Sequence, residues 1–132
     1  MVWLYEFSST RFNPADEPPN PINPFAGYGL LQWLGETLAQ TDFNVSLPPE
    51  AEDWGWYIIA SSPPASYLIG AADQSIDDQG KVEWAIQVYR ERSILDKLLG
   101  RNKLSANEPI LLAIQTILDT TPEIEMVSSY EG

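Results

Sequence analysis

The segment from Val82 to Tyr89 places the strongest constraint on the fold, because a large apolar side chain occupies every second position from Val82 to Val88. Alternation with a period of two is typical of a β-strand with one buried face. A shift of one residue would expose Trp84 and bury Glu83, so the apolar face must point into the core. The sequence therefore predicts a strand whose buried residues are Val82, Trp84, Ile86 and Val88.

Further strands are predicted where apolar or aromatic runs are bounded by proline or polar loops. The expected segments are Val2–Ser8, Trp54–Ser61, Ala65–Ala72 and, at the end of the chain, Ile124–Val127. The second and third of these form a hairpin around Pro63 and Pro64. The five prolines of residues 9–24 predict an extended connector. Residues 42–49 are expected to form another connector, and residues 73–80 a polar loop.

Capping signals predict where the helices begin. Asn23–Pro24 indicates the start of a long helix that continues to about Gln40, and Ser93 with Asp96 indicates a short helix that ends at Gly100. The buried side of the long helix is expected to hold Tyr28, Leu31, Leu34 and Leu38, widened by Leu30 and Ala39.

A last helix is expected where Ser105 and Glu108 precede Pro109, and it should end near Asp119. Its apolar stripe consists of Ile110, Leu111, Ile114, Ile117 and Leu118. Two long helices that each carry one apolar stripe must bury those stripes on a common surface. The prediction is a single α+β domain over residues 1–132, with a mostly antiparallel sheet of four to five strands and both main helices on one face.

Composition excludes several classes of chemistry, because the chain contains no cysteine and no histidine. Without them there is no disulfide framework, no Ser/His/Asp or Cys/His catalysis and no ordinary zinc site. A calcium-loop pattern ahead of Gly80 also fails, since Ile86 occupies the position where the pattern requires glutamate. We therefore expect no cofactor, no metal and no catalytic residue, and the chain is interpreted as non-enzymatic.

The net charge of −12 is unevenly distributed. Residues 81–103 contain six of the seven basic residues and carry about +3, which leaves about −15 on the rest of the chain. This acidity disfavours direct binding to nucleic acid or an anionic membrane and favours a protein partner with a basic surface. No apolar run is long enough to span a membrane, and the beginning of the chain lacks a secretory pattern, so we expect a cytoplasmic protein.

The most distinctive stretch is Pro48–Ile59, which combines three carboxylates with two tryptophans. It predicts an acidic turn leading into a strand, and its candidate partner-binding residues are Glu50, Glu52, Asp53 and Trp54. Gly55 separates Trp54 from Trp56, and we expect Trp56 in the core and Trp54 partly exposed. The alternative is a carboxylate-based enzyme or a sugar-binding module centred on Glu50–Trp56.

The run from Pro49 to Trp56, preceded by a helix with several glycines, resembles a segment of small uncharacterised bacterial proteins with an E-D-W-G-W signature. The resemblance covers residues 20–70. It implies a helix followed by a strand hairpin and a bacterial or phage origin, and it implies no activity.

These observations together predict an acidic protein-binding domain of the immunity, anti-defence or adaptor type, which acts by stoichiometric contact with a more basic partner. Mimicry of nucleic acid by the acidic surface is a further possibility, and it requires carboxylates spaced like phosphates.

Overall fold

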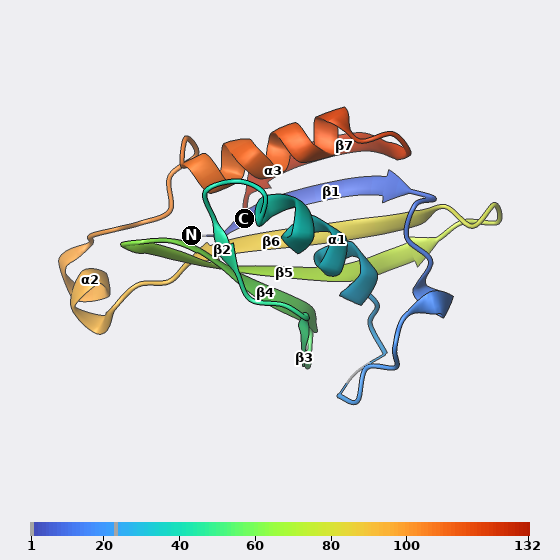
Figure 1. The fold of residues 1–132 in the computed structure, drawn as a ribbon, viewed down its shortest axis with the longest axis horizontal. Coiled ribbons are helices and arrows are strands. Elements are labelled where there is room, and N and C mark those ends of the chain that lie inside the picture. The colour runs from blue at the N-terminus through green and yellow to red at the C-terminus, as the bar shows by residue number, and fades with distance from the viewer. Residues whose placement is uncertain (1, 23) are drawn as a thin grey trace.

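The computed structural model describes residues 2–22 and 24–132 and has an α+β fold (Figure 1). Within these residues, seven antiparallel strands form one sheet. The strands are β1 (Trp3–Ser9), β2 (Asn44–Val45), β3 (Glu50–Glu52), β4 (Gly55–Ser62), β5 (Ala65–Ile76), β6 (Val82–Arg90) and β7 (Ile124–Glu131). The helices are α1 (Tyr28–Leu38), α2 (Ile94–Leu99), α3 (Pro109–Thr120) and the short 3-10 helix η1 (Pro14–Asp16).

The strand order is β2-β4-β5-β6-β1-β7, and β3 pairs with β4 beside β2. The first strand of the chain therefore lies between β6 and the last strand, β7. The register aligns core residues across the sheet, with Ile58 opposite Ile69 and Ile69 opposite Val88. Apolar side chains on neighbouring strands thus form continuous rows on one face.

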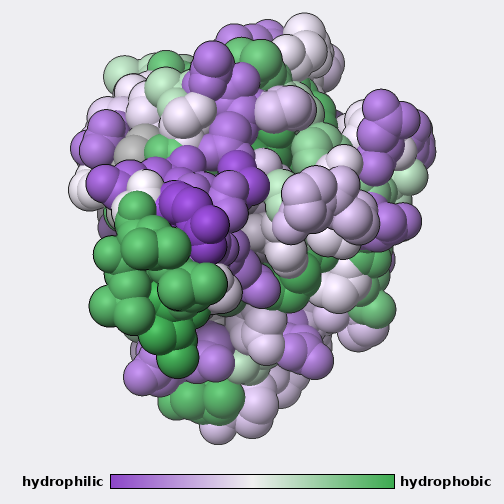
Figure 2. All heavy atoms as spheres, turned by 90° about the vertical axis from the view of Figure 1, so that its left-hand side faces the viewer, coloured by the Kyte–Doolittle hydropathy of each residue, from purple (hydrophilic) through white to green (hydrophobic). Residues whose placement is uncertain are grey.

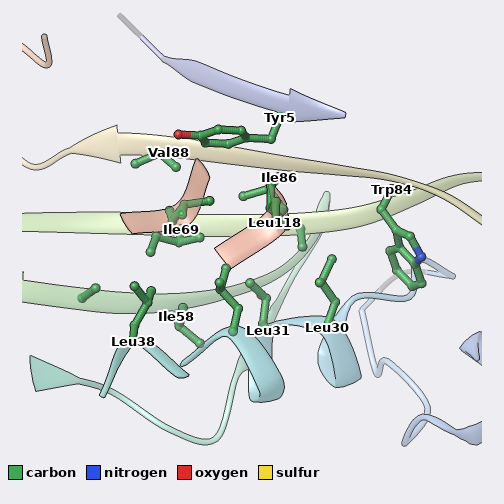
Figure 3. Packing of buried hydrophobic residues seen from close by; sticks show 14 of the residues in the cluster. Tyr5, Leu30, Leu31, Leu38, Ile58, Ile69, Trp84, Ile86, Val88 and Leu118 are labelled. Atoms are coloured by element: carbon green, nitrogen blue, oxygen red, sulfur yellow. The ribbon is translucent and has the colours of Figure 1, made fainter. Parts of the chain in front are cut away.

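Helices α1 and α3 both pack on that face, and they share one buried cluster with the strands (Figures 1 and 3). The predicted inward side of β6 is confirmed, because Val82, Trp84, Ile86 and Val88 are all buried. The stripe of α3 is also confirmed for its buried members Ile110, Leu111, Ile114 and Leu118. The Tyr5 hydroxyl donates a hydrogen bond to the Leu111 carbonyl oxygen at 2.9 Å, which ties α3 to β1.

Glu108 attaches the beginning of α3 to the sheet. Its side chain is buried and accepts hydrogen bonds from the Tyr67 hydroxyl at 2.6 Å, from the Arg90 guanidinium at 2.9 Å and from the Ser105 backbone N–H at 2.5 Å. A buried carboxylate is tolerated when a positive charge and several donors satisfy its oxygens. The expected capping role of Ser105 is replaced by this network, and the helix begins at Pro109.

The predicted start of α1 is wrong. Asn23 lies outside the described residues, Pro24 is not helical, and the helix begins only at Tyr28. Its first amides are satisfied by Glu17 in the proline-rich connector, whose carboxylate accepts from the N–H groups of Gly27 and Tyr28, both at 2.9 Å. A carboxylate brought from another segment stabilises a helix N-terminus as a local cap does.

The far end of α1 also differs from the prediction, since the helix ends at Leu38 and Ala39 is exposed. The predicted buried side is confirmed for Leu30, Leu31, Leu34 and Leu38, whereas Tyr28 is half-buried.

The prediction of four to five strands is too low, because β2 and β3 lie in segments that were expected to be a connector and an acidic turn. Two- and three-residue strands carry too little alternation to be recognised in sequence, and they are defined by their pairing with β4. β5 also extends to Ile76 and replaces the first half of the expected loop at 73–80.

Gly55 lies where two backbones approach closely. Its φ angle is +151°, and a Cβ atom at this position would lie 2.4 Å from the carbonyl oxygen of Ala71 on β5. Only glycine accommodates both conditions without displacing the neighbouring strand. As predicted, Trp56 on one side of Gly55 is buried, and Trp54 on the other side is half-buried.

We expect Gly55→Ala to lower the free energy of unfolding by about 3 kcal/mol, because the added methyl group meets a backbone atom in a strained conformation. The matched control is Gly80→Ala, where φ is +82° but no atom lies within 4 Å of the added group. That control should lose only about 1 kcal/mol. Urea unfolding of both variants measures the difference, and equal losses would show that the close approach to Ala71 has no energetic consequence.

The protein should lose stability at alkaline pH, because Tyr67 is buried and hydrogen-bonded in the folded state. Burial, and then the hydrogen bond to Glu108, raise the pKa of Tyr67 from 10 to about 12. The unfolded chain loses this proton near pH 10, whereas the folded protein retains it, so the stabilisation is complete below pH 10 and is lost as the pH rises towards 12. We expect a loss of about 2 kcal/mol over this range.

Tyr67→Phe should weaken that decline while lowering stability at neutral pH by about 1 kcal/mol through the lost hydrogen bond. A residual decline is expected in the variant, because burial and the charge of Asp119 also raise the pKa of Tyr5. Urea unfolding at a series of pH values measures both effects. An unchanged decline in Tyr67→Phe would contradict the assignment to Tyr67.

Candidate functional site

The face of the sheet that points away from α1 and α3 carries half-buried aromatic and aliphatic side chains. Tyr57 and Ile59 alternate along β4 with the core residue Ile58, and Leu68 precedes the core residue Ile69 on β5. Since side chains alternate across a strand, these three point to the opposite side of the sheet from the helices. Ile59 and Leu68 are also cross-strand partners, so they form one apolar surface.

This surface is the floor of an open groove of about 650 Å³. The residues that line it come from β3, β4, β5, the segment between β2 and β3, the turn between β3 and β4, and the residue that follows β6. They are Ser46, Leu47, Pro48, Glu50, Glu52, Trp54, Tyr57, Ile59, Leu68 and Glu91. We refer to this set as the acidic groove, because it contains three glutamates and no basic residue.

Trp54 is positioned by a glycine on the neighbouring strand. A Cβ atom at Gly70 would lie 2.4 Å from the indole ring of Trp54, so the ring packs directly on the Gly70 backbone. Any larger residue at position 70 would displace the ring, which is rigid. Trp54 itself lies in the turn between β3 and β4, and it remains half-buried at the edge of the groove.

Glu50 and Tyr57 form a polar pair at the wall of the groove. They are cross-strand partners in the β3–β4 hairpin, and the Tyr57 hydroxyl donates to the Glu50 carboxylate at 2.5 Å. This hydrogen bond is the main cause of the raised pKa of Tyr57, with smaller contributions from burial and from the charges of Glu50 and Glu52. The hydrogen bond holds the Glu50 carboxylate at the hydroxyl end of the Tyr57 side chain.

Two hydrogen bonds between Ser46 and Ile59 hold the other wall of the groove in place. The N–H of Ser46 donates to the Ile59 carbonyl at 2.9 Å, and the N–H of Ile59 donates to the Ser46 hydroxyl oxygen at 2.9 Å. These two bonds place Leu47 and Pro48 beside the floor of the groove. The wall is thus attached to β4 at both ends, through β2 and β3.

Three of the four residues predicted from the sequence lie together in the groove, namely Glu50, Glu52 and Trp54. Asp53 is exposed in the adjacent turn and does not line the groove. Sequence reasoning missed Leu68 and Glu91, which are distant in the chain. The alternation that assigns Leu68 to the face opposite Tyr67 and Ile69 was the available signal, but it does not show that Leu68 lies next to Trp54.

Two acidic residues of the segment 73–80, where the calcium-loop pattern fails, have structural partners. Asp73 accepts a hydrogen bond from the Ala26 N–H at 2.8 Å, and Asp77 accepts from the N–H groups of Gln79 and Lys81 at 2.9 Å. Among the residues that the structure describes, no group of three or more acidic side chains could hold a metal ion. None of the described helices is long and apolar enough to cross a membrane.

No protein-family model, curated protein or solved structure matches this chain. The resemblance to bacterial proteins with the E-D-W-G-W signature therefore stays a prediction.

The Glu50–Tyr57 pair yields a prediction that is specific to the site. Glu50→Gln should lower the pKa of Tyr57 towards its ordinary value, because the charged acceptor of the hydroxyl proton is removed. Glu52→Gln is the matched control and should change the pKa less, since Glu52 acts on Tyr57 only through its charge. Titration of the tyrosine ring carbons by NMR measures both values, and equal shifts in the two variants would contradict the pairing.

Proposed function

We propose that this protein is a non-enzymatic, acidic protein-binding domain that acts in the cytoplasm by stoichiometric contact with a more basic partner. The observation that carries this proposal is the acidic groove. It combines a partly exposed apolar and aromatic floor with three carboxylates and lacks a basic side chain. Such a surface is complementary to a cationic side chain that carries an apolar stem, as in lysine or arginine.

Several features of the groove support binding rather than catalysis. Glu50 is engaged by the Tyr57 hydroxyl, and Glu52 extends the acidic wall along the same strand. Trp54 and Tyr57 supply rigid aromatic surface, which contributes strongly to protein interfaces at low entropic cost. Because the groove is built on paired strands, it is formed before a partner arrives. An immunity, anti-defence or adaptor role would use such a preformed contact surface.

The alternative function is sugar binding by the same residues, and the observation that favours it is the half-buried indole of Trp54 beside Glu50 and Glu52. A sugar ring stacks on an aromatic face and donates hydroxyl hydrogen bonds to carboxylates. The two functions differ in their dependence on salt, since a neutral sugar is insensitive to ionic strength whereas a basic protein is not.

The test is affinity capture from the native host with the wild-type protein and with the groove variant Glu50→Gln/Glu52→Gln/Trp54→Ala. We expect the wild type to recover a protein with a basic surface, and we expect the groove variant to lose at least about 90% of that recovery, as for removal of interface hot spots. Increasing salt should weaken the wild-type interaction.

The matched control is Asp42→Asn/Asp78→Asn, which removes two charges at exposed positions outside the groove. It should retain the partner. Equal losses in both variants would show that only net charge matters, and a salt-insensitive interaction that is displaced by neutral oligosaccharides would support the alternative.

A further inference from the structure

The helix α2 presents an apolar surface that the rest of the described chain does not cover. None of its residues is buried, and the side chains of Ile94 and Leu98 are 79% and 78% exposed. Leu95 and Leu99 are more than half exposed as well. Figure 2 views the molecule from the α2 end and shows a contiguous hydrophobic patch beside strongly hydrophilic residues. A patch of this kind on a small protein marks an interaction surface.

Local polar contacts hold α2 in shape without help from its apolar side chains. Ser93 and Asp96 form a complete capping box, and Gly100 ends the helix in the left-handed conformation. The Arg92 guanidinium donates to the carbonyl oxygens of Arg101 and Asp96 at 3.0 and 3.2 Å. These bonds join the chain segments before and after α2. A helix of six residues would not persist alone, so these contacts keep the apolar surface presented to solvent.

The surroundings of this surface are basic, in contrast to the rest of the molecule. Residues 90–103 contain five basic and two acidic residues, although the chain as a whole carries a net charge of −12. Lys97 and Lys103 are exposed beside the apolar side chains. We refer to Ile94, Leu95, Leu98 and Leu99 together with Lys97 and Lys103 as the α2 ridge.

The acidic groove has the opposite character, because its apolar floor is bordered by Glu50, Glu52 and Glu91. The ridge and the groove are thus complementary in charge, and both offer apolar area to bury. Contact between two ridges would instead bring like charges together. An anionic membrane is disfavoured as the occupant, since the net charge of the protein would oppose its approach.

The two surfaces adjoin on each molecule. Glu91 lines the groove and precedes Ile94, the first residue of α2, by three positions. When two complementary patches lie side by side on one protein, a two-fold axis can bring each patch of one copy against the other patch of its partner, which closes the assembly as a dimer.

From these observations we propose that two copies of this chain form a reciprocal dimer in which the α2 ridge of each copy docks in the acidic groove of the other. The inference rests on the proposed function in one respect, namely that the groove is a binding surface. It adds that the groove has a ligand within the same sequence, so an external basic partner has to compete with α2 for it.

The test uses charge reversal and complementation. The groove variant is Glu52→Lys/Glu91→Lys, and the ridge variant is Lys97→Glu/Lys103→Glu. Sedimentation equilibrium should show a dimer for the wild type, and each variant alone should have a dissociation constant raised at least about 100-fold, because like charges then face each other in both contacts. An equimolar mixture of the two variants should regain the dimer, since one contact is then wild type and the other is complementary with reversed signs.

Leu98→Ser serves as an uncharged variant that weakens the dimer without altering electrostatics, and circular dichroism of all variants confirms that they are folded. Three results would overturn the inference: a monomeric wild type, a dimer that survives the groove variant, and binding of a monomeric wild type to vesicles of anionic phospholipid. Failure of the mixture to regain the dimer would overturn the reciprocal geometry.

The dimer and the proposed function can fail independently. The ridge variant has an intact groove, so it should still capture a basic partner from the host, and it should do so more strongly than the dimeric wild type. If the wild type is monomeric and the ridge variant still captures that partner, the dimer is excluded and the proposed function stands.

Discussion

The close approach of Gly55 to the carbonyl oxygen of Ala71 is the constraint on which both faces of the sheet depend. In a regular strand the two neighbours of one residue point to the same face. Here the neighbours of Gly55 point to opposite faces: Trp56 is buried in the core, and Trp54 packs on Gly70 on the open side. The same carbonyl group is approached by Gly27, where a Cβ atom would lie 2.7 Å away. The start of β4 and the start of α1 are thus positioned against one peptide group of β5.

A sheet of this size with its long helices on one side leaves the other side partly open to solvent. The core side is completed by α1 and α3, and Glu108 fixes the beginning of α3 through Tyr67 and Arg90. On the open side, β3 and the segment after β2 lie along β4 and form the walls of the groove. Two of its three carboxylates, Glu50 and Glu52, come from β3, and the third, Glu91, follows β6.

The distribution of charge gives the molecule two surfaces of opposite character. Repulsion among the acidic residues destabilises the folded domain, and the clustering of five of the seven basic residues at positions 90–103 around α2 is not needed to balance it. Two of the arginines stabilise the fold itself. Arg90 forms an ion pair with Glu108, and Arg92 donates a hydrogen bond to the Arg101 carbonyl beyond the end of α2. Lys97 and Lys103 belong to the α2 ridge, and their charges favour a partner surface that is acidic and apolar.

The sequence alone determined the elements whose signals are local. The alternation of β6, the apolar stripe of α3 and the caps of α2 at Ser93 and Gly100 all depend on residues within one turn or one strand of each other, so pattern and propensity were sufficient. The separation of Trp54 from Trp56 was also predictable, because a glycine between them in a strand indicates a bulge or a close approach of another backbone.

Tertiary structure decided everything that depends on pairing between distant segments. The start of α1 is set by Glu17 from the connector, and β2 and β3 exist only because β4 offers hydrogen-bonding partners. The groove brings Leu68 and Glu91 to Glu50 and Trp54 through sheet register, which no local pattern encodes. The sequence therefore predicted Glu50, Glu52 and Trp54 as part of the site. The pairing of the strands brought Leu68 and Glu91 to them.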